Sequence, residues 1–221
     1  MRVLMIAPPG AGKGTQGALI AAHFDVPHIA TGELLRHHVA RRTALGRTVQ
    51  EYLNRGELVP DQIVLDMLRE AMIAAKADGG GFVLDGIPRT MAQARAAYLI
   101  GRDLGMTADV ALHLQAGDAE LSRRLLARAT LEHRSDDTAE VIAQRLALYH
   151  EVTSPILSWY RDRGILVSVD AMRSAQEVGR EILAALEVMR PLLDYVPAHA
   201  RQPVDLTGLG KAFGATSVAA A

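Results

Sequence analysis

Cysteine is absent from the 221 residues of this chain. Disulfide bonds and thiolate metal sites are therefore excluded, and a reducing compartment, the cytoplasm, is the expected location. Long hydrophobic runs are missing as well. The apolar stretch at residues 3–7 ends at Pro8, which makes it too short for a signal-peptide core, and no segment approaches the length of a membrane span. We therefore predict a cytoplasmic protein without a membrane partner.

An excess of either charge is also lacking, because 24 basic and 25 acidic residues leave a formal net charge of −1. A chain of this balance is not built to wrap nucleic acid, so no nucleic-acid partner is expected. Lysine is scarce and occurs only at positions 13, 76 and 211, so nearly all basic residues are arginines. The planar guanidinium binds phosphate oxygens two at a time, and we expect the functional positive charge to be local.

Short apolar runs separated by segments of helical period indicate the fold class. Runs at residues 3–6, 82–84, 110–114 and 165–169, with a shorter candidate at residues 28–29, predict buried strands. The alternation predicts an α/β fold with a parallel five-stranded sheet and helices on both faces. Ligands in such folds bind at the C-terminal ends of strands. A last helix is predicted to end before Pro191, and residues 191–221, rich in Pro, Gly and Ala, are expected to form a loosely held tail.

The first strand runs into a glycine-rich turn, with the sequence Ala-Pro-Pro-Gly-Ala-Gly-Lys-Gly-Thr-Gln at residues 7–16. Small residues let successive backbone N–H groups surround a polyphosphate, while Lys13 reaches the outer phosphates and the Thr15 hydroxyl can hold Mg²⁺. The alternative is an ordinary turn between a strand and a helix. Ala7 stands where such loops usually have glycine; alanine there would cost about 1–2 kcal/mol if φ is positive and almost nothing if it is negative.

A second turn of this kind follows residues 82–84, with the sequence Asp-Gly-Ile-Pro-Arg-Thr at residues 85–90. Asp85 could hold a Mg²⁺-bound water and Arg89 a phosphate; the alternative is a Gly-Pro turn with an Asp cap. Further arginines lie at residues 36–55 and 123–145. Thr31 is predicted to cap the helix that opens the first of these segments, which on periodicity alone could be a helical hairpin with a solvated basic face.

These motifs, in this order, resemble the adenylate kinases, nucleoside monophosphate kinases with a P-loop NTPase-like fold, over about residues 1–190. The resemblance implies an NMP-binding helical insertion at about 31–60, a lid at about 125–137 and a separate tail at 191–221. The implied ATP site consists of Gly10, Ala11, Gly12, Lys13, Gly14, Thr15, Arg128 and Arg173. The implied AMP site consists of Thr31, Arg36, Glu57, Leu58, Val59, Gly86, Ile87, Pro88, Arg89, Gln93, Arg134 and Arg145. The implied catalytic residues are Lys13, Arg89, Arg124, Arg128, Arg134 and Arg145.

The implied activity is the reversible reaction of ATP and AMP to two ADP, with Mg²⁺ held by Thr15 and, through water, Asp85. The lid is too short and too free of cysteine for the zinc-carrying form, so no zinc is expected. A monomer that binds ATP, AMP and ADP is expected. A UMP/CMP kinase of the same fold and a nucleotide-binding regulator with weak turnover stay open as alternatives, as do other phosphate donors such as GTP. Ala7, Ile87 and Glu33 depart from the family's pattern.

Overall fold

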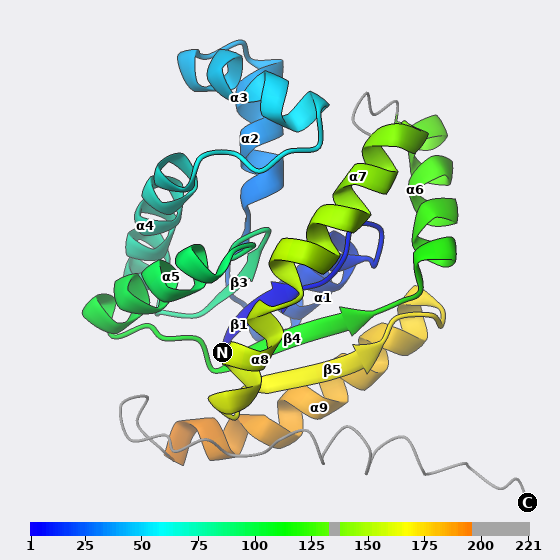
Figure 1. Cartoon of the computed structure of the whole chain (residues 1–221). Helices are drawn as coiled ribbons and strands as arrows, with labels where there is room; N and C mark the ends of the chain where they lie inside the picture. The colour runs from blue at the N-terminus through cyan, green and yellow to red at the C-terminus, as the bar shows by residue number, and fades with distance from the viewer. Residues whose placement is uncertain (133–137, 196–221) are drawn as a thin grey trace, which may run out of the picture.

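The computed structural model describes residues 1–132 and 138–195, with a five-stranded parallel sheet at the centre (Figure 1). The strands are β1 (Arg2–Ile6), β2 (His28–Ala30), β3 (Phe82–Asp85), β4 (Val110–Gln115) and β5 (Leu166–Asp170), in the spatial order β2-β3-β1-β4-β5. The α/β prediction and all five predicted strands are confirmed. Strands β2 and β3 lie on one side of the central strand β1, and β4 and β5 lie on the other side. The connections therefore change direction at β1, and a ligand crevice is expected at its C-terminal end.

Alternate side chains of β1 enter two different hydrophobic cores, as the period of a strand requires. Val3 and Met5 belong to one core, and Leu4 and Ile6 to the other. Neighbouring strands repeat the division, for example Val83 on the first face and Leu84 on the second. A strand buried on both faces reads as a continuous apolar run, which is why these segments were recognisable in the sequence.

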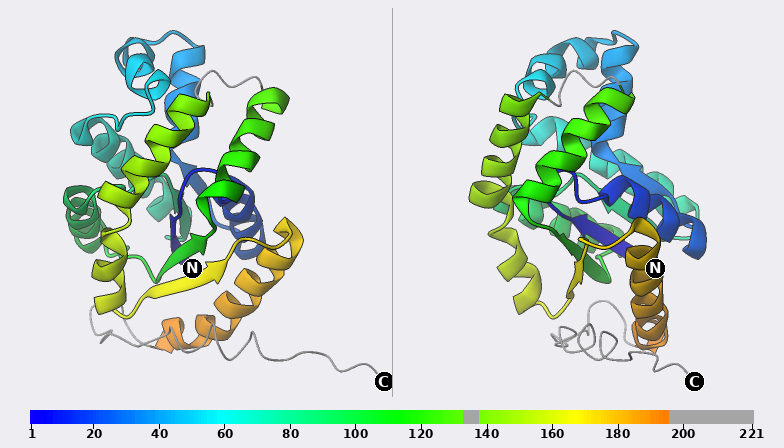
Figure 2. Two further views of the ribbon diagram at one scale, coloured as in Figure 1. Left: turned by 45° about the vertical axis from the view of Figure 1, so that its right-hand side comes forward. Right: turned by 90° about the vertical axis from the view of Figure 1, so that its right-hand side faces the viewer.

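Helices cover both faces of the sheet (Figures 1 and 2). Residues of α1 and α9 fill the core that contains Val3, and residues of α4, α5 and α8 fill the core that contains Leu4. The helix α2 packs against α3, and this pair projects from the sheet on the same side as α6 and α7 (Figure 2). The bounds are α1 (Lys13–Phe24), α2 (Thr31–Ala40), α3 (Ala44–Asn54), α4 (Asp61–Ala77), α5 (Met91–Leu104), α6 (Asp118–Glu132), α7 (Ala139–Leu148), α8 (Ile156–Asp162) and α9 (Ala175–Tyr195).

A π-helix, η1 (Tyr149–Thr153), joins α7 to α8 just before Pro155. Proline has no N–H and its ring clashes with the preceding turn, which explains why the regular helix is interrupted before Pro155. The prediction that the last helix ends before Pro191 is wrong, because α9 continues through Pro191 to Tyr195. Met189 is buried in the core and Leu193 packs against it, and this burial holds the last turns in place despite the proline.

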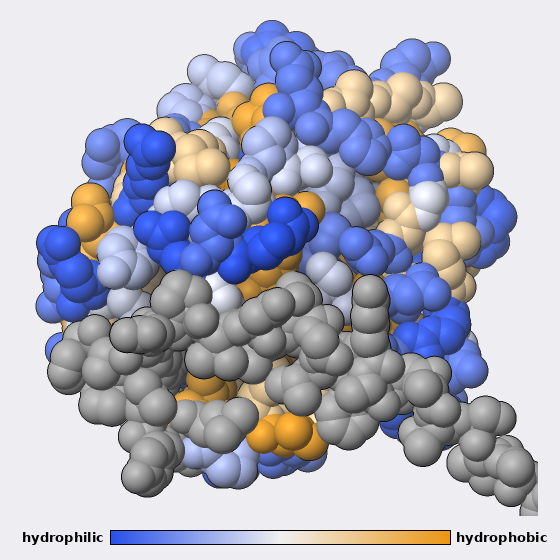
Figure 3. Space-filling model, turned by 60° about the horizontal axis from the view of Figure 1, so that its bottom comes forward, coloured by the Kyte–Doolittle hydropathy of each residue, from blue (hydrophilic) through white to orange (hydrophobic). Residues whose placement is uncertain are grey.

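The bottom face of the molecule, turned forward in Figure 3, mixes hydrophilic and hydrophobic residues wherever its residues are described. The projecting helices α2, α3, α6 and α7 point away from this face (Figure 1). In the part of the chain that the structure describes, no helix is long and apolar enough to cross a membrane.

Candidate active site

The glycine-rich loop between β1 and α1 has the backbone geometry of an anion-binding turn. Gly10 and Gly12 have φ values of 84° and 90°, and Gly12 is the residue that caps α1. The first amides of a helix have no intrahelical acceptor, so those of α1 offer donors to an anion, and the helix dipole adds to the attraction. Among the described residues other than glycine, only Asp25 and Arg42 have positive φ. Ala7 is therefore accommodated without the strain considered above.

Lys13, the first residue of α1, folds back over this loop. Its Nζ donates to the carbonyl oxygens of Ala7 at 2.8 Å and Pro8 at 3.3 Å. Burial lowers the pKa of Lys13 to about 8; Asp85 opposes this effect, and nearby arginines, led by Arg89, reinforce it. Desolvation and like charges both disfavour an ammonium ion. An anion that binds beside Nζ would relieve both effects.

Asp85 ends β3 on the strand next to β1 and begins the second predicted turn. Its backbone carbonyl accepts a hydrogen bond of 3.1 Å from the Thr31 hydroxyl. The prediction that Thr31 caps α2 is therefore wrong: Ala30 occupies the cap position and Thr31 is the first helical residue. The Thr31 hydroxyl instead joins the start of α2 to the end of β3, a contact between segments 54 residues apart.

Arg89 is fixed by hydrogen bonds from both its backbone and its side chain. Its amide donates to Gln93 Oε1 at 2.7 Å, and its Nε donates to the Gly86 carbonyl at 2.8 Å. Gln93 in turn donates from Nε2 to Asp61 Oδ1 at 2.7 Å, which connects α5 to the start of α4. Burial and the neighbouring Arg145 lower the pKa of Arg89, against the effect of Asp85. Guanidinium groups nonetheless stay charged at any physiological pH.

A cavity of about 350 Å³ opens above the glycine-rich loop and gathers most residues predicted for ATP binding and catalysis. These are Gly10, Gly12, Lys13, Gly14, Thr15, Asp85, Arg89, Arg124, Arg128 and Arg145. An adjoining cavity of about 60 Å³ gathers most of those predicted for AMP. These are Thr31, Arg36, Glu57, Leu58, Val59, Gly86, Arg89, Gln93 and Arg145. Three arginines, at positions 36, 89 and 145, line both cavities.

Four residues predicted for the site lie outside these two cavities. Ala11 and Ile87 are buried, with 3% and 1% of their surface exposed. Pro88 lines a neighbouring cavity together with Lys13 and Arg89. Arg173 forms an ion pair with Glu181 on α9. Arg134, the remaining residue of the predicted set, falls outside the described residues.

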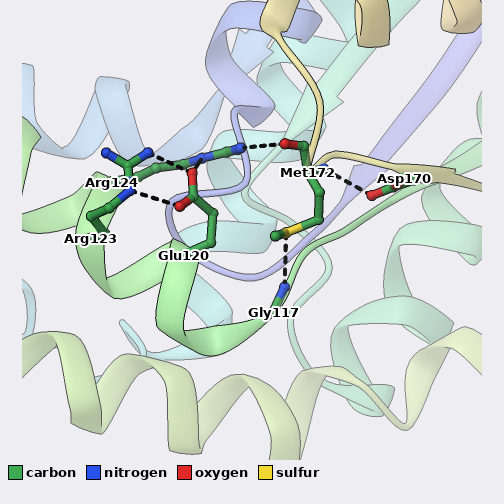
Figure 4. A network of polar contacts seen from close by, with 6 residues as sticks. All are labelled: Gly117, Glu120, Arg123, Arg124, Asp170 and Met172. Atoms are coloured by element: carbon green, nitrogen blue, oxygen red, sulfur yellow. Dashed lines mark hydrogen bonds and ion pairs between the residues drawn. The ribbon is translucent and has the colours of Figure 1, made fainter.

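Arg124 is held at the edge of the larger cavity by a polar network between α6 and the loop after β5 (Figure 4). Its Nε donates to Glu120 Oε1 at 2.7 Å, and its Nη2 lies 3.5 Å from the Met172 carbonyl oxygen. Glu120 also accepts two hydrogen bonds from Arg123, each of 2.7 Å. The hydrogen bonds from Arg123 and Arg124 lower the pKa of Glu120 to about 2. Arg124 therefore has an anionic partner at neutral pH in the absence of substrate.

Oxygen donors suitable for Mg²⁺ are present in the larger cavity. Thr15 and Asp85 both line it, and the hydroxyl and carboxylate oxygens of these residue types are ligands of the kind that Mg²⁺ prefers. Among the described residues, no group of three or more His, Cys, Asp or Glu could hold a metal ion. A magnesium ion at Thr15 and Asp85 would therefore need further oxygen ligands from phosphates or water, the usual arrangement for this ion in phosphate-transfer sites.

Tyr149 and Thr153 are among the cleft residues that were not predicted from the sequence. Tyr149 and Thr153 line a cavity together with Lys13, Arg89 and Arg145, and the Thr153 hydroxyl donates to the Arg89 carbonyl at 2.9 Å. Nothing in the local sequence of Tyr149 marks it as a residue of the cleft. Its position in the cleft results from the π-helix, for which the sequence carries no signal beyond the nearby Pro155.

Comparison with known proteins agrees with this geometry. The family model described as adenylate kinase matches residues 5–165. The chain is 42% identical to an adenylate kinase of Thermobifida fusca over 187 residues, which covers 85% of this chain and 98% of the relative. It is 46% identical to an adenylate kinase of Kocuria rhizophila over 186 residues, covering 84% of this chain and 98% of the relative. An adenylate kinase of Rhodococcus erythropolis is 43% identical over 186 residues, covering 84% of this chain and 99% of the relative.

Proposed function

The chain belongs to the adenylate kinase family and is a nucleoside monophosphate kinase, and we propose that its two cavities hold ATP and AMP for direct phosphoryl transfer. The observation that carries this proposal is the shared wall of the cavities. Arg36, Arg89 and Arg145 line both, so a phosphate chain in each would meet at the same guanidinium groups. This arrangement suits a reaction in which one phosphate attacks another.

At the ATP end, the amides at the start of α1 and the Lys13 ammonium would bind the β- and γ-phosphates. Arg124 and Arg128, one helical turn apart on α6, would face the phosphate chain from the opposite wall of the cavity. Arg134 and Arg173 are proposed as further ligands of ATP or of the transferred group. For Arg173 this requires release from Glu181, its partner in the substrate-free protein.

At the AMP end, Arg36 and Arg89 would bind the α-phosphate, and Thr31, Leu58 and Val59 would surround the base or ribose. Gln93 holds the Arg89 backbone in place and also lines the cavity, so it would serve both positioning and recognition.

Thr15 and Asp85 would hold Mg²⁺ beside the phosphates of ATP. When bound, the ion neutralises charge on the β- and γ-phosphate oxygens. The two residues would direct its position through the hydroxyl and, by way of water, the carboxylate.

The chemical step needs no general base from the protein. A phosphate with a second pKa near 6 is mostly dianionic at neutral pH, so an oxygen of the AMP α-phosphate can attack the γ-phosphorus directly. The bond from the γ-phosphorus to the β–γ bridging oxygen breaks in line, and ADP is formed on both sides. Lys13, Arg89 and Arg145 then act by position and charge alone.

Two segments would exclude water, the competing nucleophile, once both substrates are bound. We propose that α2 and α3, within the insertion at residues 31–60, close over AMP, and that the lid at residues 125–137 closes over ATP. We propose that the protein is a monomer. Sedimentation equilibrium would test the monomer, and a cytoplasmic location agrees with the cysteine-free sequence.

The decisive experiment measures the initial velocity of ADP formation with MgATP and, separately, AMP, CMP, UMP and GMP. We expect strong preference for AMP, with two ADP formed for each ATP consumed. Preference for CMP or UMP would replace the proposal by a pyrimidine kinase. ATP binding without turnover on any acceptor would support a nucleotide-binding regulator, although Ala7 gives no reason for weak turnover, because its backbone conformation suits alanine. The same assay with GTP would test other donors.

Two matched variants connect this activity to the shared wall. Arg89→Met removes a guanidinium that lines both cavities, and kcat/KM for AMP should fall by a factor on the order of 10² to 10³. Arg102→Met removes an exposed guanidinium on α5 that pairs with Asp103, and it should leave the rates unchanged. Equal rates for the two variants would contradict the proposed role of Arg89.

A further inference from the structure

A buried polar pair lies between the sheet and the helices that frame the cleft. His113 on β4 has 8% of its surface exposed, and its Nε2 lies 3.0 Å from the hydroxyl oxygen of Tyr149. Its Nδ1 lies 3.3 Å from Ser168 Oγ on β5. Burial lowers the pKa of His113 to about 4 and raises the pKa of Tyr149 to about 12. Both groups are therefore neutral at physiological pH and joined by a buried hydrogen bond.

Tyr149 is the first residue of the π-helix η1, and Thr153 is the last. Thr153 is buried, and its hydroxyl donates to the Arg89 carbonyl at 2.9 Å. The turn is thus fixed at one end to the sheet, through His113, and at the other end to the loop that carries Arg89. Single π-helical turns are rare and occur frequently at functional sites, which suggests that this one is retained for what it positions.

Arg145 lies on α7, one turn before Tyr149, so the position of the π-turn also determines where this guanidinium lies. On its other side, the Arg145 side chain packs closely against the backbone at Gly56. A Cβ added to Gly56 would lie 2.9 Å from Arg145 Cγ, so the backbone after α3 packs directly against the Arg145 stem. A shift of α7 along its axis would therefore displace Arg145 from both cavities or collide with the Gly56 turn.

We propose that the π-turn at residues 149–153 is a brace that sets the distance between Arg89 and Arg145, with His113, Tyr149 and Thr153 as positioning residues. The brace rests on the proposed function, because it matters only if these two arginines act on the same phosphates. The simpler explanation is that buried polar groups merely satisfy one another. The two explanations differ in what happens when a hydroxyl is removed without loss of volume.

The test uses full-length Thr153→Val, which keeps the shape of the side chain and loses its hydroxyl, and Thr153→Ser, which keeps the hydroxyl. Loss of one neutral hydrogen bond corresponds to about a three- to tenfold effect. We expect KM for both AMP and ATP to rise by about that factor in Thr153→Val, because both arginines line both cavities, and Thr153→Ser to restore the wild-type values. Ser158→Ala is the matched control, because this exposed hydroxyl on α8 also donates to a backbone carbonyl, that of Pro155.

Tyr149→Phe tests the same brace at its other end, because it removes only the hydroxyl that is hydrogen-bonded to His113. If the two hydrogen bonds act as one unit, the double variant Tyr149→Phe/Thr153→Val should show less than the product of the two single effects on KM for AMP. Lower melting temperatures with KM and kcat unchanged would overturn the brace in favour of simple packing. Changes in KM of the same size in Ser158→Ala would also overturn it, since they would indicate that the cleft responds to the loss of any hydroxyl on these helices.

The wild-type acceptor assay decides the proposed function independently of these variants. If wild type did not use AMP, calorimetric titration of AMP into each variant would still measure the brace, with the same three- to tenfold loss of affinity expected for Thr153→Val. Unchanged AMP affinity in that titration would overturn it.

Discussion

ATP binding is expected to draw a proton into the cleft at alkaline pH, because Lys13 is only partly protonated in the free protein. Its pKa is lowered to about 8, chiefly by burial. With that value, roughly a tenth of the Lys13 side chains are neutral at pH 7, about half at pH 8 and about nine tenths at pH 9. Phosphate oxygens next to Nζ favour the charged form. Proton uptake should therefore rise from about 0.1 to about 0.9 per ATP bound between pH 7 and pH 9.

Isothermal titration calorimetry of ATP in pairs of buffers with different ionisation enthalpies measures this uptake at each pH. Lys13→Arg keeps the positive charge on a group that does not deprotonate, so its uptake should stay near zero across the range. Lys76→Arg, the matched control on α4, should behave as wild type. ATP affinity of the wild type should also fall by up to about tenfold per pH unit above 8. Equal proton uptake by wild type and Lys13→Arg at pH 9 would refute the reasoning.

Three further predictions concern stability. Gly12→Ala should lower the free energy of unfolding by about 1–2 kcal/mol through backbone strain alone. Gly10→Ala should lower it by more, because the added Cβ would also collide with α6. Urea unfolding measures both changes. The pKa of His113 is about 6.5 in the unfolded chain and about 4 in the folded protein, so protonation favours unfolding. Between pH 6.5 and pH 4 the free energy of unfolding of the wild type should therefore fall by about 3 kcal/mol more than that of His113→Gln. Asp109→Ala removes the partner of the Arg2 guanidinium and amide and should cost about 2 kcal/mol by the same assay; a loss below about 0.5 kcal/mol would show that this ion pair is dispensable.

The strands and the glycine-rich loop could be predicted because their signals are local: a strand buried on both faces is a continuous apolar run, and closely spaced glycines before a lysine, between a strand and a helix, form a phosphate-binding motif that is readable from adjacent residues. The errors concern groups whose partners are distant in sequence. Thr31 has the right residue type for a helix cap, but its hydroxyl bonds to the Asp85 carbonyl instead. Pro191 is a valid stop signal that burial of neighbouring side chains overrides. Thr153 has no distinguishing sequence context, and only the fold brings it to Arg89.

The arginines that line the cleft differ from a lysine in how they respond to its charge. Arg89, Arg128 and Arg145 all lower the pKa of Lys13, while Asp85 raises it. A lysine in such surroundings can relieve the repulsion by releasing its proton, as about half of the Lys13 side chains do at pH 8. A guanidinium does not release its proton at physiological pH, so the arginines keep their charge when the cleft is empty. The repulsion is then relieved only when anions enter, which makes an arginine-lined cleft bind phosphates more strongly than a lysine-lined cleft of the same formal charge.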